Sequence, residues 1–153
     1  MKEIKIRLAT TEDIAVLKSF EQGIIKAERP FDETLKPDPI SYYSIENLLK
    51  DDATAVAVAT LEDKLIGSAY ATITPAKSHL KHSKYAYLGF MYVDPEQRGK
   101  GVNKSIIDFL FRWIKEKNIT EVRLDVYSEN AAALRAYKKA GFKEHLVNMR
   151  MKI

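Results

Sequence analysis

The chain contains no cysteine, and this absence excludes several classes of protein. Without thiols there is no disulfide framework, no cysteine-ligated zinc or iron–sulfur centre, and no acyl transfer through a cysteine. The chain also lacks an apolar run of the ~20 residues that span a bilayer. Its first residues, MKEIKIRL, contain no apolar block typical of a signal peptide. We therefore expect a cytoplasmic protein with no membrane partner.

The length and charge of the chain limit its function further. A chain of 153 residues suits one domain, and a hydrophobic fraction of 46% is sufficient for a packed core. The 25 basic and 21 acidic side chains leave a net charge of +4, which is too small to indicate nucleic-acid binding. A nucleic-acid binder would have to use the basic loop at 77–84, which no RNA-binding motif accompanies. We expect no nucleic-acid partner.

Hydrophobic periodicity predicts an alternation of strands and helices. The predicted strands are 4–8, 53–60, 64–73, 85–93, 121–126 and 146–152, and the predicted helices are 11–25, 41–50, 99–117 and 130–140. The proline-rich segment 28–39 and the lysine-rich segment 75–84 are predicted loops. This order indicates a mixed α/β domain in which the helix at 99–117 crosses over between two parallel strands.

A glycine-containing turn joins the strand at 85–93 to the following helix, in the sequence DPEQRGKGVNK. Such a turn frees backbone N–H groups at the positive end of a helix. Gly99 and Gly101 have no Cβ, so an anion can approach the main chain closely. Cationic donors stand beside them: Arg98, Lys100 and Lys104. The turn fits a phosphate or pyrophosphate cradle, although an ordinary glycine turn with solvated lysines has the same composition.

A second group of residues follows the strand predicted at 121–126. Asn130 stands where this strand meets the next helix, and it could cap that helix or bind a ligand amide. Tyr137 lies about two turns into the helix. Its hydroxyl can donate a proton, or the ring can serve only for packing. Neither residue is diagnostic when it is considered alone.

Taken together, the two segments resemble the GNAT superfamily of N-acetyltransferases. The matching residues are Val93-Asp-Pro95, Arg98 to Asn103 (RGKGVN), and Leu124 to Phe142 with Asn130, Ala133, Tyr137 and Gly141 in the family's positions. The segment IKIRLATTEDIAVL also resembles the family's first strand and helix, so the resemblance covers nearly the whole chain. It implies one N-acetyltransferase domain over residues 1–153, with a mixed central sheet, a splayed pair of parallel strands and helices on both faces.

The resemblance implies acetyl-CoA as the cofactor, bound where the two parallel strands splay apart. Met91 and Val93 would offer backbone groups to the pantetheine arm, and Asn130 and Ala133 would line it. Tyr137 would protonate the departing coenzyme A thiolate or form a hydrogen bond with it. The pyrophosphate would bind the N–H groups of the turn and the helix start: Arg98, Gly99, Lys100, Gly101, Val102, Asn103 and Lys104. Asn103 replaces the family's usual glycine or alanine, and we expect it to add a hydrogen bond.

The loop between the first two helices closes over the acceptor in this family. Here Glu28 could bind an ammonium group, Arg29 a carboxylate, and Phe31 an apolar part of the acceptor. The combination predicts a small primary amine, amino-acid-like or otherwise, and a protein or peptide amine is the alternative. These charged residues could equally serve only to solvate the loop.

The general base is not identified by the sequence, because the family's usual glutamate on the fourth strand is absent from Tyr87–Phe90. The candidates are Glu28, Asp32, Glu33, His79 and His82, besides a neutral amine or a water relay. The missing glutamate also leaves a non-catalytic acyl-CoA-binding module as an alternative, against which Tyr137 argues. We expect no metal site, because the H-x-x-H spacing has no third ligand. Dimers are common in the family, so a homodimer is one expected oligomeric state.

Overall fold

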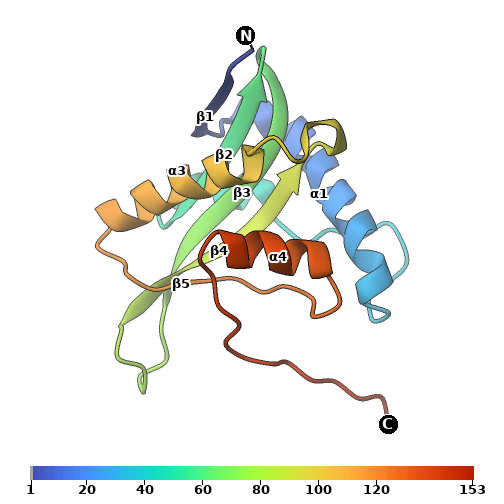
Figure 1. Ribbon diagram of the computed structural model, residues 1–153, viewed down its shortest axis with the longest axis vertical. Coiled ribbons are helices and arrows are strands. Elements are labelled where there is room, and N and C mark those ends of the chain that lie inside the picture. The colour runs from blue at the N-terminus through green and yellow to red at the C-terminus, as the bar shows by residue number, and fades with distance from the viewer. Residues whose placement is uncertain (1) are drawn as a thin grey trace.

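A five-stranded sheet forms the centre of the structure, which describes residues 2–153. The computed structural model in Figure 1 shows the strands in sequence order: β1 (Ile4–Leu8), β2 (Thr54–Leu61), β3 (Lys64–Pro75), β4 (Lys84–Val93) and β5 (Val122–Arg123). The first four strands are antiparallel, whereas β4 and β5 are parallel. A parallel pair needs a crossover connection, and α3 (Val102–Glu116) supplies it as predicted.

Helices cover both faces of this sheet, because side chains alternate between the faces along each strand. On one face α3 packs against small residues of β2 such as Ala55, Ala57 and Ala59. On the other face α1 (Ile14–Glu28) and α2 (Ile45–Lys50) pack against Val56 and Val58. The last helix, α4 (Ala131–Lys139), follows β5. The mixed α/β fold with helices on both faces is thus confirmed.

Local signals in the sequence placed several elements correctly. The turn of the β2–β3 hairpin has positive φ at Glu62 (50°) and Asp63 (65°), which suits a tight hairpin turn. Asn118 has φ 60° just after α3, where it ends the helix as predicted. The start of the first helix was also predicted near Thr10, which caps the short 3-10 turn Thr11–Asp13 before α1.

The second helix is shorter than the predicted 41–50, since α2 begins only at Ile45. The buried carboxylate of Glu21 explains the difference. Its Oε2 accepts hydrogen bonds from the backbone N–H of Tyr42 (3.0 Å) and Tyr43 (2.7 Å). These bonds hold the segment before α2 in a non-helical conformation, and they come from a residue far away in the sequence.

The helix predicted from Gly99 begins at Val102 instead, because two residues before it are in the left-handed region. Gly99 has φ 75° and Gly101 has φ 81°, and neither angle fits an α-helix. The two glycines therefore form a turn ahead of α3. Among residues 2–153, no helix has the length and apolar character required to cross a bilayer.

The C-terminal strand predicted at 146–152 is not formed. Residues 143–153 have no regular secondary structure, and Figure 1 shows them running away from the sheet. The strand predicted at 121–126 is also reduced, to the two residues Val122 and Arg123 of β5. The C-terminal segment has no strand to pair with, and β5 is short because it pairs with β4 only at Ala86–Val122 and Tyr87–Arg123.

Candidate active site

The two parallel strands separate shortly after they meet. They are paired only at Ala86–Val122 and Tyr87–Arg123. Just beyond these two pairs, between Gly89 and Tyr92, the pairing of β4 with β3 is irregular, and Phe90 has φ 58° there. Neither Phe90 nor Met91 is matched to a residue of β3 or β5, so the main chain of Met91 faces an open fork. The splayed strand pair predicted from the sequence is present.

A cavity of about 140 Å³ lies in this fork. It is lined by side chains from four parts of the chain: Ile24, Ala27 and Glu28 of α1, Met91 of β4, Asp125, Val126 and Tyr127 after β5, and Asn130, Ala133 and Tyr137 at α4. Five predicted site residues therefore meet here from three separate parts of the sequence: Glu28, Met91, Asn130, Ala133 and Tyr137. Val93 stands at the end of β4, next to the glycine turn.

The glycine turn presents open main chain at the start of α3. A Cβ added to Gly99 or Gly101 would meet nothing within 4 Å, so the space beside both residues is empty of protein. No side chain caps the N-terminus of α3 at Gly101, which leaves the N–H groups of its first turn available, including those of Val102 and Asn103. The turn therefore fits an anionic group such as a pyrophosphate.

The cationic side chains of the turn are held by weak, exposed contacts. Lys104 Nζ pairs with Asp108 Oδ2 at 2.7 Å, and Lys100 Nζ donates to Gln97 Oε1 at 3.2 Å. The Nε atom of Arg98 donates to the Val93 carbonyl at 3.3 Å. Exposed contacts of this kind contribute little, so all three cations can turn towards a bound anion.

Asn103, the departure from the family pattern, has a buried side-chain oxygen. Its Oδ1 makes no hydrogen bond to any residue within 2–153. A carbonyl oxygen can accept a hydrogen bond from an amide but cannot bind a phosphate oxygen. The hydrogen bond expected from Asn103 to the pyrophosphate would therefore have to come from the amide nitrogen, and it stays a prediction.

Asn130 and Tyr137 both face the cavity from the α4 side. The Asn130 Oδ1 atom accepts a hydrogen bond from the Ala133 backbone N–H at 3.2 Å, so Asn130 caps α4, and its amide nitrogen is left for a ligand. Burial, with the charge of Glu28 as a second cause, raises the pKa of the Tyr137 hydroxyl to about 12. Tyr137 is therefore protonated at neutral pH and can donate a hydrogen bond.

Glu28 ends α1 and is the only one of the five base candidates to line this cavity. Burial raises the pKa of its carboxyl above the ordinary value, the nearby Tyr42 hydroxyl partly opposes this effect, and the charge of Asp32 adds to it. The Tyr42 hydroxyl is buried and makes no hydrogen bond to any described residue. A half-buried carboxyl whose pKa is raised by burial is a candidate for proton exchange with a substrate.

The other two acidic candidates are paired with residues from distant parts of the chain. The Tyr127 hydroxyl donates to Asp32 Oδ2 at 2.7 Å, and Arg150 pairs with Glu33 at 3.0 Å. Tyr127 lines the cavity, and Phe31 stacks on it with ring centroids 6.2 Å apart. Phe31 thus reaches the site only through Tyr127. The sequence analysis missed Tyr42 and Tyr127. Tyr42 lies in no motif, and Tyr127 stands inside the Leu124–Phe142 segment but at none of the positions that match the family. Only the folded chain brings both tyrosines near Glu28.

Arg29 faces its own loop rather than the cavity. Its Nη2 pairs with Asp38 Oδ1 at 2.6 Å, and its Nη1 donates to the Lys36 carbonyl at 2.9 Å. A carboxylate on the acceptor would have to displace Asp38 to reach this guanidinium. The geometry therefore gives Arg29 a part in shaping the loop.

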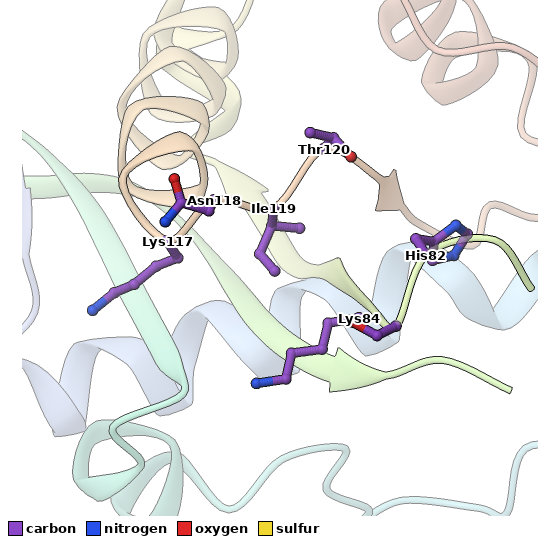
Figure 2. Close-up of a pocket in the computed structure, with 7 residues that line it drawn as sticks. His82, Lys84, Lys117, Asn118, Ile119 and Thr120 are labelled. Atoms are coloured by element: carbon purple, nitrogen blue, oxygen red, sulfur yellow. The ribbon is translucent and has the colours of Figure 1, made fainter. Parts of the chain in front are cut away.

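A second hollow, of about 370 Å³, lies at the other end of β4, and Figure 2 shows the residues that line it. It contains His82, but the Lys84 and Lys117 side chains extend away from that imidazole rather than converging on it. The start of β4 at Lys84 is roughly 20 Å along the strand from Met91, at ~3.3 Å per residue. His82 is therefore remote from the fork, and no group of three or more metal-binding side chains occurs within residues 2–153.

Comparisons with known proteins agree with this architecture. The model of the Acetyltransferase (GNAT) family matches residues 14–142. An N-alpha-acetyltransferase of Sulfolobus acidocaldarius is 30% identical over 146 residues, which cover 92% of this chain and 80% of that protein. An uncharacterized N-acetyltransferase of Methanocaldococcus jannaschii is 28% identical over 145 residues, and the match covers 94% of this chain but only 62% of that relative.

Solved structures share the same fold. A predicted acetyltransferase from Clostridium acetobutylicum, determined with acetyl-CoA, superposes with a TM-score of 0.74 at 21% identity, covering 98% of this chain and 96% of that one. The aminoglycoside N-acetyltransferase AAC(6')-Iy in complex with CoA gives 0.76 at 24% identity, covering 100% and 97%. With the family match over most of its length, the chain belongs to the GNAT family of acetyltransferases.

Proposed function

We propose that this protein transfers the acetyl group of acetyl-CoA directly to a primary amine of a small molecule. The observation that carries the proposal is the cavity in the β4–β5 fork, where Met91, Glu28 and Tyr137 line one space. The structural neighbours determined with acetyl-CoA and with CoA support the choice of cofactor. Bound there, acetyl-CoA supplies the acetyl thioester that the amine attacks.

Different parts of the site bind different parts of acetyl-CoA. The open main chain at Gly99 and Gly101 and the first turn of α3 hold the pyrophosphate. The unmatched main chain of Met91 binds the pantetheine arm and polarises the thioester carbonyl. Asn130 and Ala133 line the same cavity from the start of α4. The cofactor thus spans the fork from the glycine turn to the cavity.

Glu28 and Tyr137 handle the protons of the reaction. Glu28 takes a proton from the ammonium group of the acceptor, which then attacks the acetyl carbon as a neutral amine. The C–N bond forms as the C–S bond breaks. Tyr137, with a pKa of about 12, donates a hydrogen bond to the departing sulfur instead of losing its proton outright, because a thiol has a pKa of only ~8.5. The thiolate receives its proton from the nitrogen or from solvent.

The groups around Glu28 indicate a cationic acceptor that carries hydrogen-bonding groups. Two carboxylates, Glu28 and Asp32, stand near the hydroxyls of Tyr42 and Tyr127. This arrangement attracts an ammonium group and offers donors for hydroxyls. Arg29 is engaged by Asp38, so the acceptor does not require a carboxylate. A polyhydroxylated or otherwise polar small amine is the class that fits best.

A peptide amino terminus is the second candidate, favoured by the N-alpha-acetyltransferase of Sulfolobus acidocaldarius at 30% identity. A non-catalytic acyl-CoA-binding module is disfavoured, because a carboxyl with a raised pKa shares the cavity with Tyr137.

The experiment that tests these alternatives measures thiol release from acetyl-CoA by the purified protein. The panel contains small amines with and without a carboxylate, amino sugars, and short peptides with free amino termini.

We expect turnover on small amines, without preference for those that carry a carboxylate. Turnover on peptides alone would replace the small-molecule acceptor by a peptide. Tight coenzyme A binding without turnover on any amine would support the binding module and overturn the enzymatic proposal.

A further inference from the structure

The segment just before α2 is held against α1 by two neighbouring side chains of that helix. The Glu21 carboxylate accepts hydrogen bonds from the backbone N–H groups of Tyr42 at 3.0 Å and Tyr43 at 2.7 Å. Next to it, Gln22 Nε2 donates to the Ile40 carbonyl at 2.9 Å. Glu21 is only 3% exposed, and a buried carboxylate is stable only when its oxygens are hydrogen-bonded. These contacts therefore fix the main chain of the segment.

The aromatic rings of the same segment are fixed as well. Tyr43 stacks on Phe90 with ring centroids 4.8 Å apart, and Phe90 is a buried residue of β4 at the fork. Tyr42 packs edge-on against Tyr43, with centroids 5.8 Å apart and an angle of 81° between the rings. Tyr42 is thus held at its main chain by Glu21 and at its ring by Tyr43, so the direction of its side chain is set.

The Tyr42 hydroxyl stands beside the Glu28 carboxyl. Glu28 lines the cavity in the fork, whereas Tyr42 does not. The hydroxyl is buried and makes no hydrogen bond to any described residue, so its proton is left for a neighbour. Among residues 2–153, Tyr42 is the group that lowers the pKa of Glu28, as a donor to the ionised carboxylate does. Tyr42 therefore reaches the reaction only through Glu28.

The remaining ionisable groups around Glu28 do not supply this donor. They come from each element packed against it: Asp32 after α1, Tyr43 before α2, Asp125 and Tyr127 after β5, and Tyr137 on α4. The two aspartates cannot donate when they are ionised, and the Tyr127 hydroxyl already donates to Asp32. Within residues 2–153 the cavity is lined by no lysine, arginine or histidine. Burial raises the pKa of the Tyr42 hydroxyl above its ordinary value, so it keeps its proton while Glu28 titrates.

One helix carries both the candidate base and the anchor of the tyrosine beside it. Glu21 and Glu28 are seven residues apart on α1, which places them on the same side of the helix and roughly 10 Å apart along it. We propose that Tyr42 is a positioning residue for Glu28: the Glu21 carboxylate fixes the segment that carries Tyr42, and the Tyr42 hydroxyl holds the ionised Glu28 carboxylate for the incoming ammonium group. This role rests on the proposed function, in which Glu28 is the base.

The first test follows the titration of the Glu28 carboxyl by carbon-13 NMR of the full-length protein labelled in its glutamate side chains. Glu28→Gln identifies the Glu28 signal. Since a donor to the ionised form lowers a pKa, Tyr42→Phe should move the titration of Glu28 to higher pH. Tyr85→Phe removes a hydroxyl from a residue that does not line the cavity and should leave the titration in place. An unchanged Glu28 titration in Tyr42→Phe would overturn the proposal, whatever the activity of that variant.

The second test is the pH dependence of kcat/KM for the amine. On the acidic limb we expect Tyr42→Phe to lower kcat/KM about tenfold, because a hydrogen bond to a charged group contributes roughly that factor. Above this limb the variant should approach the parent protein. A loss of the same size at every pH would mean that Tyr42 only supports the loop, and the positioning role would be wrong.

The two tests separate this role from the proposed function. If Tyr42→Phe moves the NMR titration but Glu28→Gln keeps the acidic limb of the parent, the contact between Tyr42 and Glu28 is supported. The assignment of Glu28 as the base is then wrong.

Glu21→Gln tests the anchor, because a glutamine side chain offers one acceptor oxygen to the two N–H groups instead of two. We expect the acidic limb to move in the same direction as in Tyr42→Phe. The double variant should move no further than Tyr42→Phe alone, since Glu21 acts through that hydroxyl. Glu46→Gln is the matched control, because Glu46 joins α2 to α1 through an exposed pair with Lys18 at 2.8 Å. Additive effects in the double variant, or an equal effect of Glu46→Gln, would overturn the role of Glu21. Circular dichroism checks that each variant keeps the fold.

Discussion

Glu28 of α1 and Tyr137 of α4 line the same cavity, and the Glu28 carboxyl and the Tyr137 hydroxyl each have a raised pKa. Burial is the main cause for both groups, and the charge of Glu28 also acts on Tyr137. The raised pKa keeps the Tyr137 hydroxyl protonated at neutral pH, whereas the Glu28 carboxyl holds its proton to a higher pH than an ordinary carboxyl does. One environment thereby produces a hydrogen-bond donor and a proton acceptor, a division that acid–base catalysis requires.

Replacing Glu28 by glutamine tests its role as the base. We expect kcat/KM for the amine to fall by roughly 10²- to 10⁴-fold, the usual contribution of such a group. A base must be deprotonated, so activity of the parent protein is present above the raised pKa of Glu28 and is lost as the pH falls through it. Glu28→Gln should abolish this limb of the pH–rate profile.

The matched control for this variant is Glu33→Gln in the same loop. Glu33 pairs with Arg150 and does not line the cavity, so its removal should leave kcat/KM within about twofold, the scatter expected of a weak surface pair. If Glu28→Gln keeps the parent's acidic limb, or if both variants lose activity equally, Glu28 is not the base.

Tyr137→Phe removes the hydrogen-bond donor without removing the ring. We expect kcat to fall roughly 100-fold while the affinity for acetyl-CoA changes little, because the donor acts on charge that develops on the sulfur. Tyr85→Phe is the control, since Tyr85 packs under Arg123 on β4 and does not line the cavity. Steady-state kinetics with acetyl-CoA varied separates the two effects, and an unchanged kcat would refute the assignment.

Gly101→Glu should abolish coenzyme A binding, because it fills the open space at the start of α3 with a negative charge. The positive φ of 81° also makes any side chain there costly by about 1–2 kcal/mol. Gly141→Glu is a matched control, since Gly141 has φ 107° and open space but lies at the end of α4. Calorimetric titration with coenzyme A measures the difference. Equal affinities in the two variants would place the pyrophosphate elsewhere.

The sequence predicted those features that depend on neighbouring residues. The glycine turn, the Asn130 cap and the hairpin turn each have their signal within a few positions. The five candidates for the base could not be ranked in this way, because burial beside Tyr137 depends on how α1 and α4 pack. The late start of α2 was missed for the same reason: the Glu21 carboxylate that holds the preceding segment comes from another helix. The strand predicted at 146–152 had the right alternation, but alternation does not provide a neighbouring strand.

Arg29→Ala distinguishes a loop-shaping role from recognition of a carboxylate. The guanidinium binds Asp38 and the Lys36 carbonyl, so we expect its loss to loosen the loop and to raise KM for all amines by a similar factor. Paired acceptors that differ only in a carboxylate provide the measurement. A loss confined to the carboxylate-bearing members would restore the amino-acid-like acceptor predicted from the sequence.

The start of α1, the helix that carries Glu28, depends on an ion pair between the exposed Arg7 and the buried Asp13, which is sensitive to acid. Asp13 accepts hydrogen bonds from Arg7 at 2.7 and 3.0 Å and from the Thr10 backbone N–H at 2.8 Å. The Arg7 bond is the main cause that lowers the pKa of the Asp13 carboxyl, and it outweighs the opposing effect of burial. Since the pKa is lower in the folded state, this stabilisation is complete above the unfolded value of ~3.9 and is lost as the pH falls through the folded value.

We therefore expect Asp13→Asn to lower the free energy of unfolding by about 2 kcal/mol at pH 7, the typical contribution of hydrogen bonds to a charged group. The difference from the parent protein should narrow as the pH falls below ~3.9, because the parent carboxyl then becomes neutral as well. Urea denaturation at pH 7 and at acidic pH measures both quantities, with Asp52→Asn at an exposed position as the control. A difference that stays constant across this range would mean that Asp13 stabilises α1 through packing rather than through its charge.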